Sequence, residues 1–259
     1  MSLRTGTFPA VALAVAGLLL TGCAGDTGKA APAAANVSAS ASAVGRSGPS
    51  RHSGPEAQGG VRAREIPSLG PGTRERITAA NRQAVVVVGQ GPNSNRSLAA
   101  LYERDPVLGW RPVTGAWPAH NGLLGWTDDH EAGDRRSPIG VFGLTDAGGR
   151  LPNPGTKLPY DEGPDFDAPG TGFEGESLEG SFDHVVAINY NREPGTTPLD
   201  WTRPLGADKG GGIWIHVDHG GPTQGCISLP LDRMELLLRW LDPAKRPVVV
   251  MGDAAALSE

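Results

Sequence analysis

A histidine and a cysteine near the C-terminal end of the sequence have the residue types of a thiol nucleophile and its base. His216 and Cys226 lie ten residues apart in the stretch 212–229. A free thiol has a pKa of about 8.5, so a nucleophilic cysteine needs a base that takes its proton. Gly225 directly precedes the cysteine and lets backbone N–H groups approach a ligand closely. The amides of Gly225 and Cys226 are therefore candidates for an oxyanion hole.

The element that must position the histidine is a strand. Aliphatic residues alternate with a tryptophan and a histidine through 212–217, which predicts a strand with two different faces. One face carries Ile213, Ile215 and Val217, and the other carries Trp214 and His216. A glycine- and proline-containing turn at 220–222 then returns the chain towards Cys226. His219 lies directly before this turn and competes for the role of base, but anchoring in a strand favours His216.

The rest of the sequence predicts a mainly β domain with one helix packed on the sheet. Apolar residues recur three and four positions apart over 231–241, which indicates one buried helical face. Pro230 suits the start of this helix, and Asp242-Pro243 ends it. Further strands are predicted over 83–89, 97–102, 110–117, 139–144, 184–190 and 247–251.

The N-terminal end has the pattern of an export signal. A short basic start precedes an apolar run from Phe8 to Leu20, which is too short to span a bilayer. Leu20-Thr-Gly-Cys23 resembles the lipobox of bacterial lipoproteins, in which the cysteine is lipidated. An ordinary signal peptide with an incidental cysteine is the alternative. We therefore expect a signal peptide at 1–22, a lipid-anchored disordered linker at 23–75, and a catalytic domain at 76–259.

Charge and cysteine content exclude some classes of protein. The chain has 259 residues, with 23 basic and 28 acidic side chains and a net charge of −5. Nucleic-acid-binding proteins typically carry a cluster of basic residues, and this sequence has no such cluster. The two cysteines, Cys23 and Cys226, each lie in a context of their own, so we expect no disulfide between them.

The region around Cys226 resembles the L,D-transpeptidase (YkuD-like) catalytic domain. That family pairs a strand-end histidine with a later Ser/Thr-x-Gly-Cys, here Ile215-His216 and 223–226. Segments that also fit are Glu131–Asp134, Ser137–Phe142, Pro152–Tyr160 and Ile188–Asn191. The resemblance extends over roughly 85–253 and implies a mixed β-sandwich or barrel-like fold.

The resemblance implies a peptidoglycan acyltransferase without metal or cofactor. His216 would activate Cys226, and the thiolate would attack the diamino-acid carbonyl of a donor stem tetrapeptide, releasing its terminal D-Ala. Transfer to the amine of a neighbouring stem would make a 3-3 crosslink, whereas transfer to water would make the protein an L,D-carboxypeptidase. The backbone carbonyl of Val217 is expected to orient the imidazole.

Three departures from the family pattern concern the site. The His-to-Cys spacing is short, Gln224 stands where histidine is common, and Ser228 stands where arginine is usual. The missing arginine leaves open how a substrate carboxylate is held. The candidate substrate-binding residues are Tyr160, Trp214, His219, Thr223, Gln224 and Ser228. Simple packing is the alternative for Tyr160 and Trp214, and His120 and His130 are expected in structural or surface roles.

Two functions of other classes remain open on the sequence. His216, Asp218, His219 and Cys226 are all possible zinc ligands, although no motif with zinc-site spacing occurs. A non-catalytic peptidoglycan-binding lipoprotein of the same fold is the second. For the transpeptidase we expect a monomer outside the cytoplasmic membrane, held to its outer face through Cys23 and acting within the cell wall.

Overall fold

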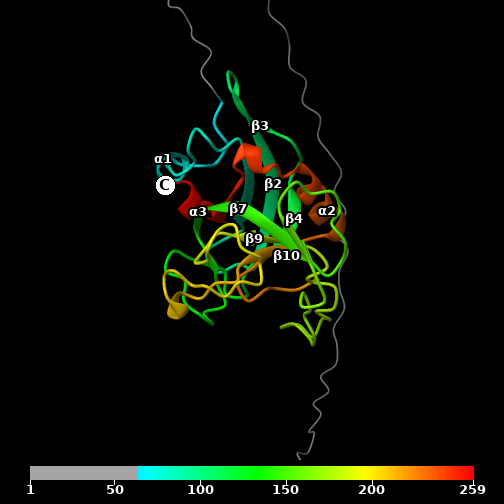
Figure 1. Cartoon of the computed structure of the whole chain (residues 1–259). Helices are drawn as coiled ribbons and strands as arrows, with labels where there is room; N and C mark the ends of the chain where they lie inside the picture. The colour runs from blue at the N-terminus through cyan, green and yellow to red at the C-terminus, as the bar shows by residue number, and fades with distance from the viewer. Residues whose placement is uncertain (1–63) are drawn as a thin grey trace, which may run out of the picture. The chain divides into compact units, whose positions relative to one another are not determined.

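The computed structural model describes residues 64–259 (Figure 1). The expected signal peptide, the lipidation residue Cys23 and most of the expected linker lie outside the described residues. None of the helices in the described part has the length and apolar character needed to span a bilayer.

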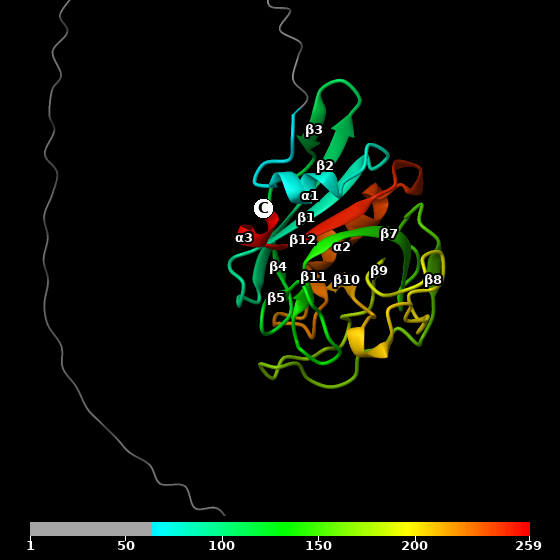
Figure 2. The ribbon, with the colours of Figure 1, turned by 90° about the vertical axis from the view of Figure 1, so that its left-hand side faces the viewer.

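Strands of the described region form a closed ring, which confirms the expected mainly β, barrel-like fold. The order is β1-β12-β7-β9-β10-β11-β4-β2, and β2 pairs again with β1. These strands are β1 (Gln83–Gly89), β2 (Arg96–Asp105), β4 (Trp117–His120), β7 (Gly140–Gly149), β9 (Val185–Ile188), β10 (Trp214–Val217), β11 (Ile227–Leu229) and β12 (Val248–Asp253). Figure 2 shows β1, β12 and β7 lying side by side. Two strands lie off the ring: β3 (Gly109–Pro112) pairs with β2, and β8 (Tyr160–Glu162) pairs with β7.

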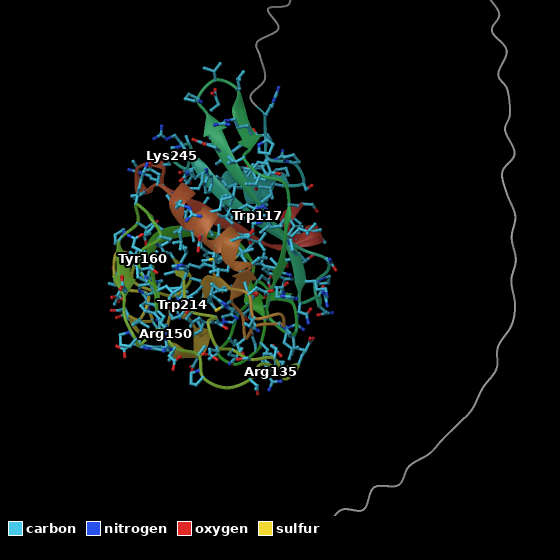
Figure 3. All side chains as sticks on the ribbon, turned by 90° about the vertical axis from the view of Figure 1, so that its right-hand side faces the viewer. Trp117, Arg135, Arg150, Tyr160, Trp214 and Lys245 are labelled. Carbon is cyan, nitrogen blue, oxygen red and sulfur yellow. The ribbon has the colours of Figure 1, made fainter. Side chains whose placement is uncertain are left out.

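The expected helix covers the interior of the ring. It is α2, Leu231–Trp240, and it lies across the strands in Figure 3. Its buried side chains are Met234, Leu237 and Leu238, which share one apolar cluster with Ile215 and Ile227 of the neighbouring strands. The spacing of apolar residues three and four positions apart therefore correctly predicts which face of α2 packs on the sheet. The short 3-10 turn η2, Pro243–Lys245, then leads into β12.

The folded region begins before residue 76, where the sequence analysis placed the end of the linker. Ile66 and Leu69 have only 1% and 2% of their surface exposed. They join a second apolar cluster with residues of β1, β3, β12 and the short C-terminal helix α3 (Ala254–Leu257), and the short helix α1 (Pro71–Glu75) follows them in the chain. The amide of Gly70 also donates to the Leu257 carbonyl at 2.8 Å. Residues 64–75 are thus part of the domain, which corrects the predicted boundary.

The single strand expected over 110–117 is wrong, because the chain forms two strands there. β3 ends at Pro112, and β4 begins at Trp117. Between them the Thr114 hydroxyl accepts a hydrogen bond from the Leu101 amide at 3.1 Å, which ties a turn to β2. A side chain that replaces a backbone partner in this way favours a turn over a continuing strand. A small parallel pair, β5 (Trp126–Thr127) and β6 (Ser137–Pro138), follows.

Candidate active site

The candidate base is fixed on the strand that the sequence predicted. His216 lies in β10 between β9 and β11, and only 3% of its surface is exposed. Its Nδ1 lies 2.8 Å from the carbonyl oxygen of Val217, which confirms the predicted contact. A carbonyl only accepts hydrogen bonds, so Nδ1 carries the proton and Nε2 is the free acceptor. The Phe182 ring packs edge-on against the imidazole, with centroids 5.4 Å apart.

The cysteine lies directly before β11 and beside the strand of the histidine. The parallel register pairs Ile215 with Ile227, so Trp214 and Cys226 are adjacent across the two strands. The Trp214 amide donates to the Sγ atom of Cys226 at 3.4 Å, and the thiol donates to the Gly212 carbonyl at 3.7 Å. Cys226 is a free, half-buried thiol. A backbone N–H aimed at the sulfur stabilises a thiolate when one forms.

Burial keeps both groups neutral in the resting protein. It raises the pKa of the Cys226 thiol to about 11, and the Trp214 amide opposes this rise only in part. Burial also lowers the pKa of His216 to about 4, although the Val217 carbonyl acts in the opposite direction. The resting pair at neutral pH is therefore thiol and imidazole, with no preformed ion pair. A neutral imidazole with a free Nε2 is competent as a general base.

Side-chain hydroxyls hold the loop that presents the cysteine. Thr223 Oγ1 donates to the Cys226 carbonyl at 2.6 Å and accepts from the Gly225 amide at 3.1 Å. Ser137 Oγ donates to the Gly225 carbonyl at 2.7 Å and accepts from the Gly122 amide at 2.9 Å. The Gly225 amide, one of the two expected oxyanion donors, is therefore already engaged by Thr223. The expected substrate contact Thr223 uses its hydroxyl inside the loop.

Gly225 is required by its backbone and by its surroundings. Its φ is +153°, and an added Cβ would lie 2.9 Å from the Arg136 carbonyl oxygen and 3.2 Å from Cδ1 of Ile213. Both contacts are tighter than those of ordinary Cβ atoms, and the backbone atom has little freedom to move. The Gly-Cys dipeptide thus depends on a close approach between the cysteine loop and the segment before β6.

Most of the described domain matches one protein family. The family model for the YkuD L,D-transpeptidase catalytic domain matches residues 83–250. The chain belongs to this family. The matched residues contain the ring strands from β1 to the first half of β12, together with His216 and Cys226. Comparison with curated proteins gives no match.

Cys226 of this L,D-transpeptidase domain lies between two cavities. The first, of about 220 Å³, is lined by His216 and His219 and by the rings of Phe173 and Phe182; we call it the Phe cavity. The second, of about 380 Å³, is lined by Trp201, Arg203 and the glycines 210–212; we call it the Arg cavity. Cys226 and the exposed Gln224 line both. The sulfur is thus open to ligand from two sides.

His219 lies beside the base and is paired with a carboxylate. Its ring stacks on that of His216, with centroids 5.8 Å apart and an angle of 10° between the planes. Its Nδ1 lies 3.2 Å from Oε1 of Glu176, a residue that the sequence analysis did not identify. His219 lines the Phe cavity, as expected for a substrate contact. The contact with Glu176 also ties the turn after β10 to the segment 171–177.

Ser228, which replaces the usual arginine of the family, contacts an aspartate. Its Oγ donates to Oδ1 of Asp218 at 2.6 Å, and Nδ1 of His120 lies 2.8 Å from the same oxygen. Register pairs His216 with Ser228 and Ser228 with His120, so the three side chains share one face of β10, β11 and β4. Ser228 is fully buried and lines neither cavity. Its position indicates support of the sheet below the base.

Two expected substrate contacts pack elsewhere. Tyr160 donates from its hydroxyl to the Leu151 carbonyl at 2.8 Å, lies 2.9 Å from Nδ1 of His184, and lines neither cavity at Cys226. The Trp214 ring packs between Phe166 and Phe182, with the centroid of Phe182 4.9 Å away. Tyr160 and the Trp214 side chain are thus placed as packing residues, and Trp214 reaches Cys226 through its backbone amide.

The metal-site alternative has no geometric support in the described region. Among residues 64–259 no three histidine, cysteine, aspartate or glutamate side chains are grouped so that they could hold a metal ion. Four residues at the cavities were not predicted from the sequence, because they lie in long loops without periodicity: Phe173, Glu176, Phe182 and Arg203. His130, expected in a structural or surface role, is buried, lies 3.1 Å from Asp134 and lines the Arg cavity.

Proposed function

We propose that this protein is a cysteine-dependent peptidoglycan L,D-transpeptidase that makes 3-3 crosslinks between stem peptides. The observation that carries the proposal is the orientation of His216. Its Nδ1–H is held by the Val217 carbonyl, so Nε2 remains as an acceptor in the Phe cavity that also contains Cys226. An arrangement of this kind suits general-base activation of a thiol. Membership of the L,D-transpeptidase family supplies the substrate class.

Acylation would proceed from the neutral pair. His216 Nε2 takes the Sγ proton of Cys226 as the sulfur attacks the diamino-acid carbonyl of a donor stem tetrapeptide. The Trp214 amide, 3.4 Å from the sulfur, stabilises the developing thiolate. The carbonyl oxygen becomes an oxyanion, and we assign the Cys226 amide as its donor. The carbon–nitrogen bond then breaks, the imidazolium returns its proton to the leaving amine, and D-Ala departs.

Transfer would reverse these steps with a different amine. The amine of a neighbouring diamino acid attacks the thioester, gives a proton to His216, and expels the Cys226 sulfur, which takes the proton back. One amide bond replaces another, so the exchange needs no external energy source. Water in place of the amine would give the carboxypeptidase reaction, and the product of the acyl-enzyme therefore separates the two activities.

We also propose that Cys23 is lipidated and holds the domain at the outer face of the cytoplasmic membrane. The support is the order of basic start, apolar run and Leu-Thr-Gly-Cys at the N-terminus. Two or more acyl chains give stable anchoring. In cells that process lipoproteins, the wild-type chain should partition into detergent with the mass of a diacylated cysteine. A Cys23→Ser chain that partitions identically would contradict the anchor.

The enzymatic proposal is tested with a donor tetrapeptide, an acceptor stem peptide and the full chain. Mass spectrometry should detect released D-Ala together with a peptide dimer linked between the two diamino acids. Cys226→Ala should form neither product. Release of D-Ala with only a tripeptide product would establish the carboxypeptidase reaction. Binding of both peptides without either product would favour the non-catalytic alternative.

A further inference from the structure

The two cavities at Cys226 differ in charge. The Arg cavity has one charged side chain in its lining, Arg203, besides the titratable ring of His130. The Phe cavity has no lysine, arginine, aspartate or glutamate in its lining, and its titratable groups are His216, His219 and Cys226. Any anionic group of a ligand that spans Cys226 is therefore stabilised on the Arg203 side.

The guanidinium of Arg203 is held in place without a carboxylate partner. Its Nη1 donates to the backbone carbonyls of Asp200 and Thr202 at 3.1 and 3.0 Å. The group stacks over the Trp201 ring, 4.8 Å from the centroid. Within residues 64–259, no carboxylate oxygen lies within 4.0 Å of it. Burial lowers the pKa of Arg203, against the influence of Asp200, so its partly desolvated charge lacks full compensation.

Glycines of the cavity wall make room for this guanidinium. A Cβ on Gly211 would lie 2.3 Å from Nε of Arg203, and one on Gly212 would lie 3.5 Å from its Nη2. The same glycines precede β10, and the Gly212 carbonyl accepts from the Cys226 thiol. The arginine thus packs against the backbone segment that contacts the nucleophile, which places cation and sulfur in one cavity.

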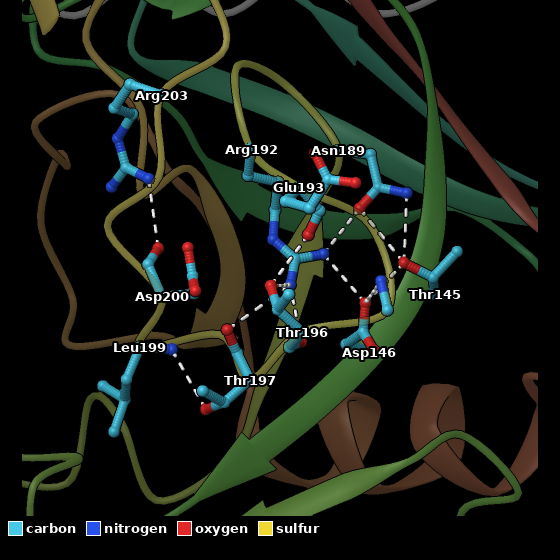
Figure 4. A network of polar contacts seen from close by, with 11 residues as sticks. Thr145, Asp146, Asn189, Arg192, Glu193, Thr196, Thr197, Leu199, Asp200 and Arg203 are labelled. Carbon is cyan, nitrogen blue, oxygen red and sulfur yellow. Dashed lines mark hydrogen bonds and ion pairs between the residues drawn. The ribbon is translucent and has the colours of Figure 1, made fainter.

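The loop that carries Arg203 is anchored at its base. Arg192 Nη1 lies 2.9 Å from Oδ2 of Asp146 in a pair whose side chains are each 3% exposed. The same guanidinium donates to Asn189 Oδ1 at 2.7 Å and to the Thr196 carbonyl at 2.7 Å (Figure 4). Asn191 closes the loop, since its Nδ2 donates to the Gly206 and Gly210 carbonyls at 2.9 and 2.7 Å. A fixed loop can hold a cation in one position for a ligand.

From this geometry we infer that the Arg cavity is the subsite for the residue on the amine side of the scissile bond, and that Arg203 binds the free carboxylate of that residue. The inference rests on the proposed function, because the donor there ends in D-Ala and its carboxylate lies one residue beyond the attacked carbonyl. The diamino-acid side of the scissile bond then faces the Phe cavity. Position 228 has a serine in place of the arginine that is usual in the family, and Arg203 supplies the positive charge instead.

The test compares two donors that differ only in that carboxylate. L-Ala-γ-D-Glu-meso-diaminopimelyl-D-Ala and its C-terminal carboxamide, with the lysine counterparts of both, are offered to the full chain, and release of D-Ala or D-alaninamide is measured. A charge-assisted hydrogen bond should give the wild type a preference for the acid on the order of 10- to 100-fold in kcat/KM. Arg203→Gln should lose this preference, because its kcat/KM for the acid falls to that for the amide.

A matched control is Arg150→Gln, which removes the same charge from an exposed arginine that lines neither cavity. It should keep the full preference for the acid. Equal loss of rate on both donors in Arg203→Gln would indicate a merely structural role and overturn the inference. Retention of the preference would also overturn it, because the carboxylate would then be bound elsewhere.

Binding to chains with Cys226→Ala separates failure of this inference from failure of the proposed function. The acid should bind more tightly than the amide when Arg203 is present, and equally when it is glutamine. Equal binding of acid and amide with Arg203 present would refute the subsite, whether or not the enzyme turns over. Absence of D-Ala release by the wild type, with the acid still bound preferentially, would refute the transpeptidase and leave a carboxylate-binding cavity.

Discussion

The Nδ1 atom of His216 lies 2.8 Å from the carbonyl oxygen of Val217, and this hydrogen bond fixes the tautomer of the candidate base. The proton on Nδ1 leaves Nε2 unprotonated. Burial lowers the pKa of the imidazole to about 4 and raises that of the Cys226 thiol to about 11. The proposed reaction would therefore start from two neutral groups, unlike that of cysteine enzymes with a preformed thiolate–imidazolium pair.

The neutral pair predicts a simple pH profile for acylation of Cys226. His216 stays neutral until the pH falls towards its pKa of about 4. The rate of acylation by a carbapenem should therefore be nearly constant over roughly pH 6 to 9 and fall only below that range. Stopped-flow measurement of the rate gives the profile. A limb with a midpoint near neutral pH would contradict a buried neutral histidine.

Substitution of Gly225 should disturb the cysteine loop. In Gly225→Ala, the new Cβ meets the Arg136 carbonyl at 2.9 Å while φ remains near +153°. We expect a loss of about 1–3 kcal/mol in the free energy of unfolding and at least a tenfold slower acylation. Gly91→Ala is the control, because nothing lies within 4 Å of its Cβ. Denaturant unfolding and acylation rates compare the two; wild-type behaviour of Gly225→Ala would show that the loop tolerates the contact.

The Asp218 carboxylate should stabilise the domain in a pH-dependent way. Burial opposes its ionisation, yet hydrogen bonds from His120 and Ser228 lower its pKa to about 2. A depressed folded pKa contributes stability that is present above the unfolded value and is lost as the pH falls towards 2. With allowance for partial exposure, Asp218→Asn should reduce the free energy of unfolding at pH 7 by about 1–2 kcal/mol.

The same comparison at low pH serves as its control. Near pH 2–3 the wild-type carboxyl is itself becoming neutral, so the difference between wild type and Asp218→Asn should shrink. A difference that is independent of pH would mean that the charge of Asp218 contributes nothing and that only packing was changed. Ser228→Ala should show a smaller loss of the same sign, because the hydrogen bond from His120 remains.

The buried pair beneath the Arg203 loop should be sensitive to removal of one partner. Arg192→Met leaves Asp146 buried with its hydrogen bonds from Thr145 and the Gly195 amide but without its countercharge. Breaking a buried pair in this way typically reduces the free energy of unfolding by about 3–5 kcal/mol. Chemical denaturation measures the loss, and the double variant Arg192→Met/Asp146→Leu should recover part of it. A single variant as stable as the wild type would show that the network does not anchor the loop.

The sequence predicts the strands and the helix in which apolar residues recur at a regular spacing. The strand 83–89 coincides with β1, and the helix expected over 231–241 ends one residue earlier at Trp240. His216 and Cys226 were also predicted, because alternation fixes the face of β10 and the glycine marks the cysteine loop. Glu176 and Arg203 lie in the loops 163–184 and 189–213, on either side of β9, where no pattern of residues indicates a conformation. Their positions depend on contacts distant in sequence, such as Arg192 with Asp146, which periodicity does not report.

Two further errors have local causes. Residues 110–117 look like one strand because their apolar and aromatic content is high, but the Thr114 side chain ties a turn to β2. The predicted N-terminal boundary at residue 76 is too late, because Ile66 and Leu69 are isolated apolar residues in a polar segment and show no periodicity. Their burial arises from packing in a cluster that joins β1 and Trp110 to Val248, Val250 and Leu257 from the far end of the chain.

The most direct test of the central claim is intact-mass spectrometry of the full chain after incubation with a carbapenem, which acylates a nucleophilic cysteine. We predict one covalent adduct per chain, absent from Cys226→Ala and formed much more slowly in His216→Ala. Unfolding measurements on both variants check that each is folded. No adduct on the folded wild type, or an adduct that persists in Cys226→Ala, would contradict the assignment of Cys226 as nucleophile. An adduct that forms equally fast in His216→Ala would contradict the assignment of His216 as its base.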